Sequence, residues 1–261
     1  MTLRAVRAGR GTTVVLLHGY GESLMSWRGL FDRLAAHADV IALDLPGFGL
    51  SEKPPSGYGT VPLANTVLAA ATALGADSFV LVGHSLGGAV AAAASLQAPG
   101  RVSGLVLIDP AGVAAPPLLP DTATPGGDAA RLTIAEYEAQ RTRFAAVHDP
   151  AWLAEDPADS TYLPASDAAY RHSLIAVLQE FDFAFLTDER ARRIRLPTLI
   201  VWGAYDAVFP VTHGRWLLDR LPASRLVILE RAWHRPHVER PAETADTVVA
   251  FLRALGMGSS P

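Results

Sequence analysis

The feature that most constrains this chain is a serine set among glycines, between an apolar run and an alanine-rich run. Residues 79–82 (Phe-Val-Leu-Val) have the composition of a buried strand, and residues 88–96 have that of a helix. Gly83 and Gly87 stand two residues before and two residues after Ser85, where they let the backbone bend without side-chain collisions. The pattern predicts a strand, a sharp turn that lifts the Ser85 hydroxyl clear of a sheet, and a helix whose first N–H groups point toward it.

The turn by itself has two interpretations. Glycine-rich strand-to-helix turns also occur in α/β proteins simply because they permit close packing. In the other interpretation Ser85 is a nucleophile, and the start of the helix stabilises negative charge on a substrate oxygen. A serine hydroxyl is a weak nucleophile at neutral pH, so this interpretation requires a base, usually a histidine oriented by a carboxylate.

A candidate carboxylate follows a later strand. Residues 199–202 form an apolar run that ends at Gly203, and Asp206 comes just beyond it. The simpler interpretation is an aspartate in an ordinary turn. Ligands of open parallel sheets gather at the carboxyl ends of the strands, however, and that is the edge at which Ser85 is predicted to lie.

The candidate base is His234. It follows the apolar run 226–229 and precedes a helical stretch from about residue 242 to residue 255, so it too comes after the carboxyl end of a predicted strand. The chain order is serine, acid, histidine. We therefore expect Ser85, Asp206 and His234 to meet at one edge of the sheet.

The alternation of strand-like and helical runs sets the fold class. It extends over residues 13–109 and again over residues 197–255, which predicts an α/β fold with a mostly parallel sheet covered by helices on both faces. Between these parts lie a segment rich in proline and glycine (114–127) and helical-looking pieces at 133–147 and 167–186. We expect a core domain of residues 1–111 and 191–261 and a helical lid of residues 112–190 inserted after the strand that ends near Asp109.

These motifs resemble the α/β-hydrolase superfamily, specifically its lid-bearing, serine esterase-like branch. The resemblance covers nearly the whole chain and rests on the segments 18–21 (His-Gly-Tyr-Gly), 44–51, 83–88, 108–112, 202–206 and 234–241. One departure is visible: many relatives have glycine immediately before the histidine that corresponds to His234, whereas this chain has Trp233. Trp233 therefore bears on the shape of the pocket near the base.

The resemblance implies a reaction and a set of roles. Ser85, His234 and Asp206 would be the catalytic residues of a carboxylesterase-like serine hydrolase that forms an acyl-enzyme and needs no metal or organic cofactor. The backbone N–H groups of Tyr20 and Leu86 would form the oxyanion hole; the alternative for the segment around Tyr20 is a tight turn with a structural histidine. Serine at the turn argues against haloalkane dehalogenases and epoxide hydrolases, which use a carboxylate there.

Two other functions stay open. Carbon–carbon bond hydrolases of diketone-type ring-cleavage products share the triad and a similar lid. A small-ligand receptor that retains the triad and turns over slowly or not at all is the second alternative. The expected substrate is a small to medium, apolar ester, because the lid segment is rich in aromatic residues that either line a pocket or pack the lid; these are Tyr137, Phe144, Trp152, Tyr162, Tyr170, Phe181, Phe183 and Phe185.

The other histidines are weaker candidates for the base. His84 lies beside Ser85 and is expected to support the turn. His237 is the best rival to His234, and their i, i+3 spacing would suit part of a metal site, but no cluster supplying a third ligand is evident in the sequence. The remaining four have no motif around them, and surface or lid positions explain them: His37, His148, His172 and His213.

Composition excludes several other classes. The formal net charge is −4 and Lys53 is the only lysine among 261 residues, so nucleic acid is not an expected partner. The absence of cysteine excludes disulfides, thiolate metal sites and a cysteine nucleophile. The apolar runs are too short for a membrane span, and residues 1–7 lack the apolar centre of a signal peptide, so a cytoplasmic location is expected.

Overall fold

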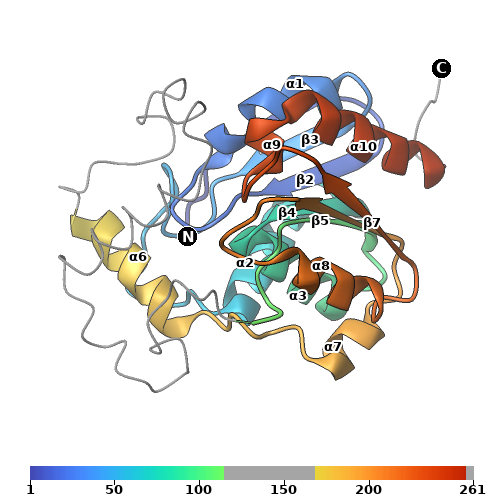
Figure 1. The fold of residues 1–261 in the computed structure, drawn as a ribbon. Helices are drawn as coiled ribbons and strands as arrows, with labels where there is room; N and C mark the ends of the chain where they lie inside the picture. The colour runs from blue at the N-terminus through green and yellow to red at the C-terminus, as the bar shows by residue number, and fades with distance from the viewer. Residues whose placement is uncertain (115–167, 257–261) are drawn as a thin grey trace.

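The fold is built on one seven-stranded sheet. The computed structural model describes residues 1–114 and 168–256, and its strands lie in the order β1-β3-β2-β4-β5-β6-β7 (Figure 1). The strands are β1 (Ala5–Gly9), β2 (Thr13–Leu17), β3 (Asp39–Leu43), β4 (Phe79–His84), β5 (Val102–Ile108), β6 (Thr198–Gly203) and β7 (Ser224–Leu229). All neighbouring pairs are parallel except β1 and β3. The predicted mostly parallel α/β sheet is confirmed.

The antiparallel edge strand β1 was not predicted. Its sequence, Ala-Val-Arg-Ala-Gly, has no apolar run, and all five residues are exposed. It forms by pairing with β3, in a register that sets Ala5 opposite Leu43 and Gly9 opposite Asp39. A strand held by backbone pairing and by an ion pair between Arg7 and Asp39, with all of its residues exposed, leaves little trace in the hydrophobic pattern.

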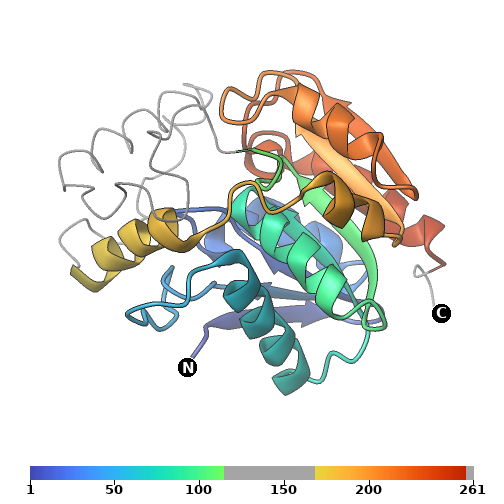
Figure 2. The same cartoon turned by 90° about the horizontal axis from the view of Figure 1, so that it is seen from below.

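Helices cover both faces of the sheet. One face carries α1 and α10, which pack against each other, and the opposite face carries α2, α3 and α8 (Figure 1 and Figure 2). The helices are η1 (a 3₁₀ helix, Leu24–Trp27), α1 (Arg28–Ala35), α2 (Thr60–Ala73), α3 (Leu86–Gln97), α6 (Ala168–Glu180), α7 (Asp188–Arg193), α8 (Val211–Leu218), α9 (Pro236–Glu239) and α10 (Pro241–Ala254).

The central strands are buried on both sides, so the molecule has two cores. Successive residues of β2 enter opposite cores: Val15 and Leu17 pack with α2 and α3, whereas Val14 and Leu16 pack with α1 and α10. All four side chains are fully buried. This explains why the parallel strands read as continuous apolar runs rather than as alternating ones.

Part of the predicted lid is described. The helix expected over residues 167–186 is α6, and it ends at Glu180, because Asp182 then forms a local turn in which its Oδ1 accepts from the Ala184 N–H at 3.0 Å. Among the aromatic residues expected in the lid, Tyr170, Phe181, Phe183 and Phe185 are buried and pack in the core on the α2–α3 side. Tyr137, Phe144, Trp152 and Tyr162 lie outside the described residues, as do His148 and the helical piece 133–147, so the division into core and lid stays a prediction.

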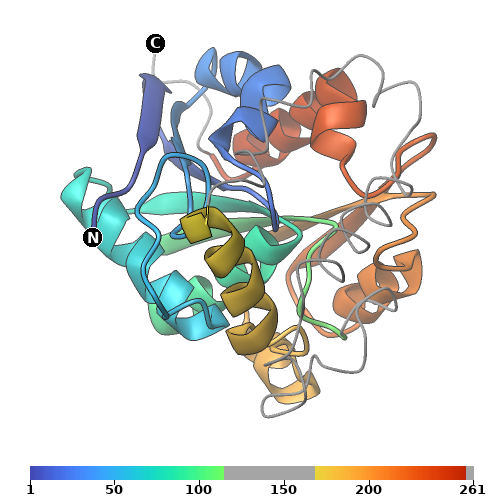
Figure 3. The same ribbon diagram turned by 90° about the vertical axis from the view of Figure 1, so that its left-hand side faces the viewer.

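Helix α6 is tied to the loop that follows β2. The Tyr170 hydroxyl donates to the Gly21 carbonyl at 3.1 Å, and the Tyr20 hydroxyl donates to the Leu174 carbonyl at 3.0 Å. Because that loop leaves the carboxyl end of β2, α6 lies beyond the carboxyl ends of the parallel strands (Figure 3). Within residues 1–114 and 168–256, no helix has both the length and the apolar character needed to cross a membrane.

Candidate active site

The turn between β4 and α3 is as sharp as its glycines predicted. Ser85 has φ 50° and ψ −117°, a conformation that few residues with a side chain adopt, and it lies at the N-cap position of α3 without a capping bond from its side chain. A Cβ atom on Gly83 would lie 2.2 Å from the Gly87 carbonyl oxygen, and one on Gly87 would lie 2.3 Å from that of Leu17. The two glycines therefore give the turn the space it needs, and Ser85 remains 8% exposed at the sheet edge.

The three residues predicted from the strand ends meet in one hydrogen-bonded line. His234 Nε2 lies 3.1 Å from Ser85 Oγ, and His234 Nδ1 lies 2.8 Å from Asp206 Oδ2. Asp206 Oδ1 accepts the N–H groups of Val208 and Phe209 at 2.7 and 3.0 Å, which fixes the carboxylate. With Nδ1–H donating to the carboxylate, Nε2 is left to accept the serine proton.

The residues predicted as oxyanion donors lie on the two expected elements. Leu86 is the first residue of α3, so its N–H has no partner within the helix. Tyr20 lies in the turn after β2. His18, two residues before Tyr20, is a structural histidine. Its Nε2 accepts the Leu45 N–H at 3.0 Å, and its Nδ1 lies 2.8 Å from the Gly19 carbonyl oxygen. The role of Tyr20 and Leu86 as donors to an oxyanion stays a prediction.

Asp109 is a second buried carboxyl group next to Asp206. It follows β5 with φ 40°, is fully buried, and its Oδ1 accepts the Gly203 N–H at 3.0 Å. Burial, and then the charge of Asp206, raise the pKa of Asp109 well above its usual range. Burial therefore favours the protonated form of Asp109, and among the described residues its Oδ2 has no hydrogen-bond partner.

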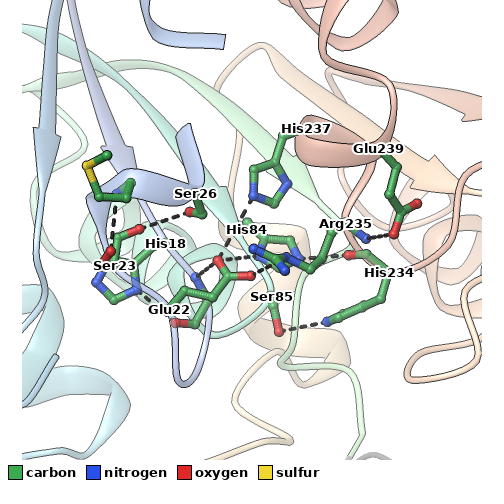
Figure 4. Close-up of polar contacts among 12 residues, drawn as sticks. His18, Glu22, Ser23, Ser26, His84, Ser85, His234, Arg235, His237 and Glu239 are labelled. Carbon is green, nitrogen blue, oxygen red and sulfur yellow. Dashed lines mark hydrogen bonds and ion pairs between the residues drawn. The ribbon is translucent and has the colours of Figure 1, made fainter. Parts of the chain in front are cut away.

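A buried network surrounds His84, the neighbour of Ser85. His84 Nδ1 lies 3.2 Å from Glu22 Oε2, and His84 Nε2 lies 2.8 Å from the His234 carbonyl oxygen. Glu22 Oε2 also accepts the Gly19 N–H at 2.9 Å, and Glu22 Oε1 lies 2.8 Å from Arg235 Nε. The carboxylate lies among His84, Arg235 and His237 (Figure 4). His84 therefore joins Glu22 to the main chain of His234, and its supporting role stays a prediction.

The charges in this network compensate one another. Burial alone raises the pKa of Glu22, but the charges of His84 and Arg235 outweigh burial and hold that pKa well below its usual range. Burial lowers the pKa of His84, against the opposing effect of Glu22. Glu22 is therefore a buried carboxylate whose charge depends on its partners.

His237 does not compete with His234 for the role of base. It is fully buried, and neither ring nitrogen makes a hydrogen bond. Its ring packs against those of Trp27 and His84, at centroid distances of 4.5 and 4.3 Å. Burial lowers the pKa of His237 well below its usual range. His234, by contrast, lies between Ser85 and Asp206.

One group among the described residues has the donors of a metal site. Glu22, His84 and His237 each offer one ligand atom, and these atoms lie within 4.8 Å of one another. Of the pair that the sequence suggested, His234 and His237, only His237 belongs to this group. The Arg235 guanidinium lies against the same carboxylate, however, and its positive charge opposes a bound cation. The arrangement suits an internal ion-pair network better than a metal centre.

Trp233 is turned toward a neighbouring aromatic ring. Its ring packs against that of Tyr205 with 5.5 Å between centroids. Glu239 accepts the N–H groups of Trp233 and Arg235, and so holds the main chain on both sides of His234. Burial raises the pKa of Glu239.

Sequence reasoning missed Glu22, and it quoted Asp109 and Arg235 only within segments. All three follow the carboxyl end of a strand, and two of them are acids. A position after a strand end was therefore the signal by which they could have been found. Their partners, however, are up to 213 residues away along the chain, since Glu22 pairs with Arg235.

Comparison with known proteins points to one family. The sequence profile described as alpha/beta hydrolase fold matches residues 12–241. The chain is 30% identical to a pimeloyl-[acyl-carrier protein] methyl ester esterase of Aeromonas salmonicida, over 97% of this chain and 100% of that protein. It is also 30% identical to a 2-hydroxy-6-oxo-6-(2'-aminophenyl)hexa-2,4-dienoic acid hydrolase of Metapseudomonas resinovorans, over 95% of this chain and 87% of that protein.

A solved structure agrees with the sequence relatives. Est816, described as an N-acyl homoserine lactone degrading enzyme, superposes with a TM-score of 0.80 at 25% identity, over 95% of this chain and 96% of that one.

Proposed function

The chain belongs to the α/β-hydrolase fold family, and on that premise we propose that it is a serine hydrolase that cleaves small to medium carboxylic esters through an acyl-enzyme on Ser85. One observation carries the proposal: the hydrogen-bonded line from Ser85 Oγ through His234 to Asp206. The esterase among the relatives supports the ester class. No step requires a metal or organic cofactor.

In the first half of the reaction, Ser85 Oγ attacks the ester carbonyl while His234 Nε2 accepts the serine proton. Asp206 stabilises the imidazolium through its bond to Nδ1, and its own position is fixed by the N–H groups of Val208 and Phe209. The N–H groups of Tyr20 and Leu86 hold the oxyanion. In systems where one such donor has been removed, the loss is about 3 to 4 kcal/mol of transition-state stabilisation.

Collapse of the tetrahedral intermediate then releases the alcohol, which takes its proton from His234. The acyl group remains on Ser85. In the second half, His234 Nε2 removes a proton from a water molecule that attacks the acyl carbonyl. The acid product leaves, and the proton returns to Ser85 Oγ.

The proposal is tested by turnover of p-nitrophenyl esters of several acyl lengths. We expect Ser85→Ala to lower kcat by at least about 10⁴-fold, because the nucleophile is lost. Ser95→Ala is the matched control: Ser95 is a buried serine of α3 whose hydroxyl donates to the Ala92 carbonyl at 2.8 Å, away from the site. Unchanged turnover in Ser85→Ala would remove the nucleophile assignment.

A carbon–carbon bond hydrolase is the second candidate, because the hexadienoic acid hydrolase matches at the same identity as the esterase. Assaying a vinylogous diketone beside a simple ester separates the two candidates. A receptor that retains the triad would label with a fluorophosphonate at Ser85 and yet turn over neither substrate.

A further inference from the structure

Glu22 contacts three segments that lie far apart in the sequence. Its own loop follows β2, His84 ends β4, and Arg235 lies between β7 and α9. These are the segments that carry the proposed oxyanion donor Tyr20, the nucleophile Ser85 and the base His234. A single carboxylate therefore contacts every loop that the proposed reaction uses, apart from the loop of Asp206.

The contacts use both oxygens of Glu22. Oε2 accepts the Gly19 N–H at 2.9 Å and lies 3.2 Å from His84 Nδ1, and Oε1 lies 2.8 Å from Arg235 Nε. The residue is 4% exposed. Buried charged groups with several short partners hold those partners in one geometry, because leaving the charge unpaired is costly.

Two routes lead from Glu22 to the reacting groups. The first runs through His84, whose Nε2 lies 2.8 Å from the carbonyl oxygen of His234, so the ring bridges Glu22 to the main chain of the base. The second runs through the Gly19 N–H, which is one residue before Tyr20. The first route ends at the backbone of the base, and the second ends one residue before the proposed oxyanion donor.

We propose that Glu22 is a positioning residue of this hydrolase, which acts through His84 and Gly19 to align the His234 base and the oxyanion loop with Ser85. This inference rests on the proposed serine chemistry. It predicts that loss of the Glu22 charge slows attack by Ser85 on any acyl or phosphonyl group, while substrate binding changes little.

The simpler alternative is that Glu22 only balances the buried charge of Arg235. Glu22→Gln distinguishes a positioning role from simple charge balance. An amide has one acceptor oxygen and must turn its NH₂ group either toward Arg235 or toward Gly19 and His84. Glu22→Asp keeps the charge but is one methylene shorter, so it reaches fewer of the partners. The matched control is Asp39→Asn, which breaks a different ion pair: Asp39 Oδ2 with Arg7 at 2.7 Å, at the amino end of β3.

The experiment measures kcat and KM for p-nitrophenyl butyrate, the rate of Ser85 labelling by a fluorophosphonate, and the thermal midpoint of each variant. For Glu22→Gln we expect kcat and the labelling rate each to fall between about 10- and 100-fold, as misplacement by about 1 Å does, with KM changed less than about threefold. Glu22→Asp should lie between Glu22→Gln and the wild type. Asp39→Asn should keep both rates even where its thermal midpoint falls.

Folded Glu22→Gln with kcat and labelling rate within twofold of the wild type would overturn the proposal. If Glu22→Gln does not fold, the comparison passes to Glu22→Asp, and the same twofold limit decides. Rates in the Glu22 variants that fall only in proportion to the loss of folded protein would also overturn the proposal. A wild-type chain that labels but turns over no ester contradicts the proposed function, while the labelling rates still decide the role of Glu22.

Discussion

At the scale of single residues, the pair formed by Asp109 and Asp206 has the clearest consequence. Two carboxyl groups follow the ends of neighbouring strands β5 and β6, and burial together with the charge of Asp206 raises the pKa of Asp109 well above its usual range. A protonated Asp109 adds no second negative charge beside the carboxyl group that faces His234. The environment of Asp109, and not its residue type alone, therefore sets its pKa.

The raised pKa of Asp109 gives a stability prediction for Asp109→Asn. In the folded wild type Asp109 binds a proton that the unfolded chain releases above pH about 4, so its contribution to the free energy of unfolding declines as pH rises above that value and up to its raised folded pKa. The amide cannot ionise and lacks this decline. The variant should therefore gain stability relative to the wild type between pH 4.5 and 7, by at most about 1.4 kcal/mol per pH unit.

Urea unfolding of both proteins at several pH values measures this difference. Asp32→Asn, at an exposed position of α1, serves as the control and should track the wild type. A difference between Asp109→Asn and the wild type that stays constant from pH 4.5 to 7 would mean that Asp109 is ionised in the folded protein. Because the amide reproduces a neutral acid, ester turnover should be retained in the variant.

At the scale of elements, the turn between β4 and α3 depends on local space. A Cβ atom at position 87 would lie 2.3 and 2.5 Å from the carbonyl oxygens of Leu17 and His18, which belong to the main chain and cannot move aside as a flexible side chain can. Gly87→Ala should therefore lower the free energy of unfolding by about 2 kcal/mol or more, through overpacking.

Gly100→Ala is the control for this turn, because a Cβ atom at Gly100 meets nothing within 4 Å. It should change stability by no more than about 0.5 kcal/mol. Chemical unfolding followed by circular dichroism compares the two variants. Equal stability of Gly87→Ala and Gly100→Ala would show that the turn tolerates a side chain.

At the scale of the whole molecule, the sheet separates two buried cores. Leu199 and Ile200 are adjacent on β6, both are fully buried, and they enter opposite cores. Each should cost about 2 to 5 kcal/mol of unfolding free energy when replaced by alanine. An amphipathic strand with one solvated face would lose stability at only one of the two positions.

A residue of the edge strand β1 serves as the control for Leu199 and Ile200. Val6 on β1 is 39% exposed, so Val6→Ala should cost no more than about 0.5 kcal/mol. Denaturant titration of the three variants tests this. A small loss at either Leu199 or Ile200 would contradict the view that both faces of the sheet are sealed.

The sequence by itself determined the features that depend on neighbouring residues. The glycines around Ser85, the continuous apolar runs and the start of α3 and α10 follow from local sterics and hydrophobic pattern, which act over a few residues. The positions of Asp206 and His234 were predicted because each follows its own strand, and a parallel sheet brings strand ends to one edge.

Only the tertiary structure decided what those residues meet. The Glu22 network joins positions 22, 84 and 235, the raised pKa of Asp109 depends on Asp206, and β1 exists because β3 offers a partner. Such contacts leave no periodic signal, because their energy comes from charge and hydrogen bonding between distant segments rather than from a repeating pattern of burial. The line of proton transfer could be predicted from strand ends, but the groups that hold it in place could not.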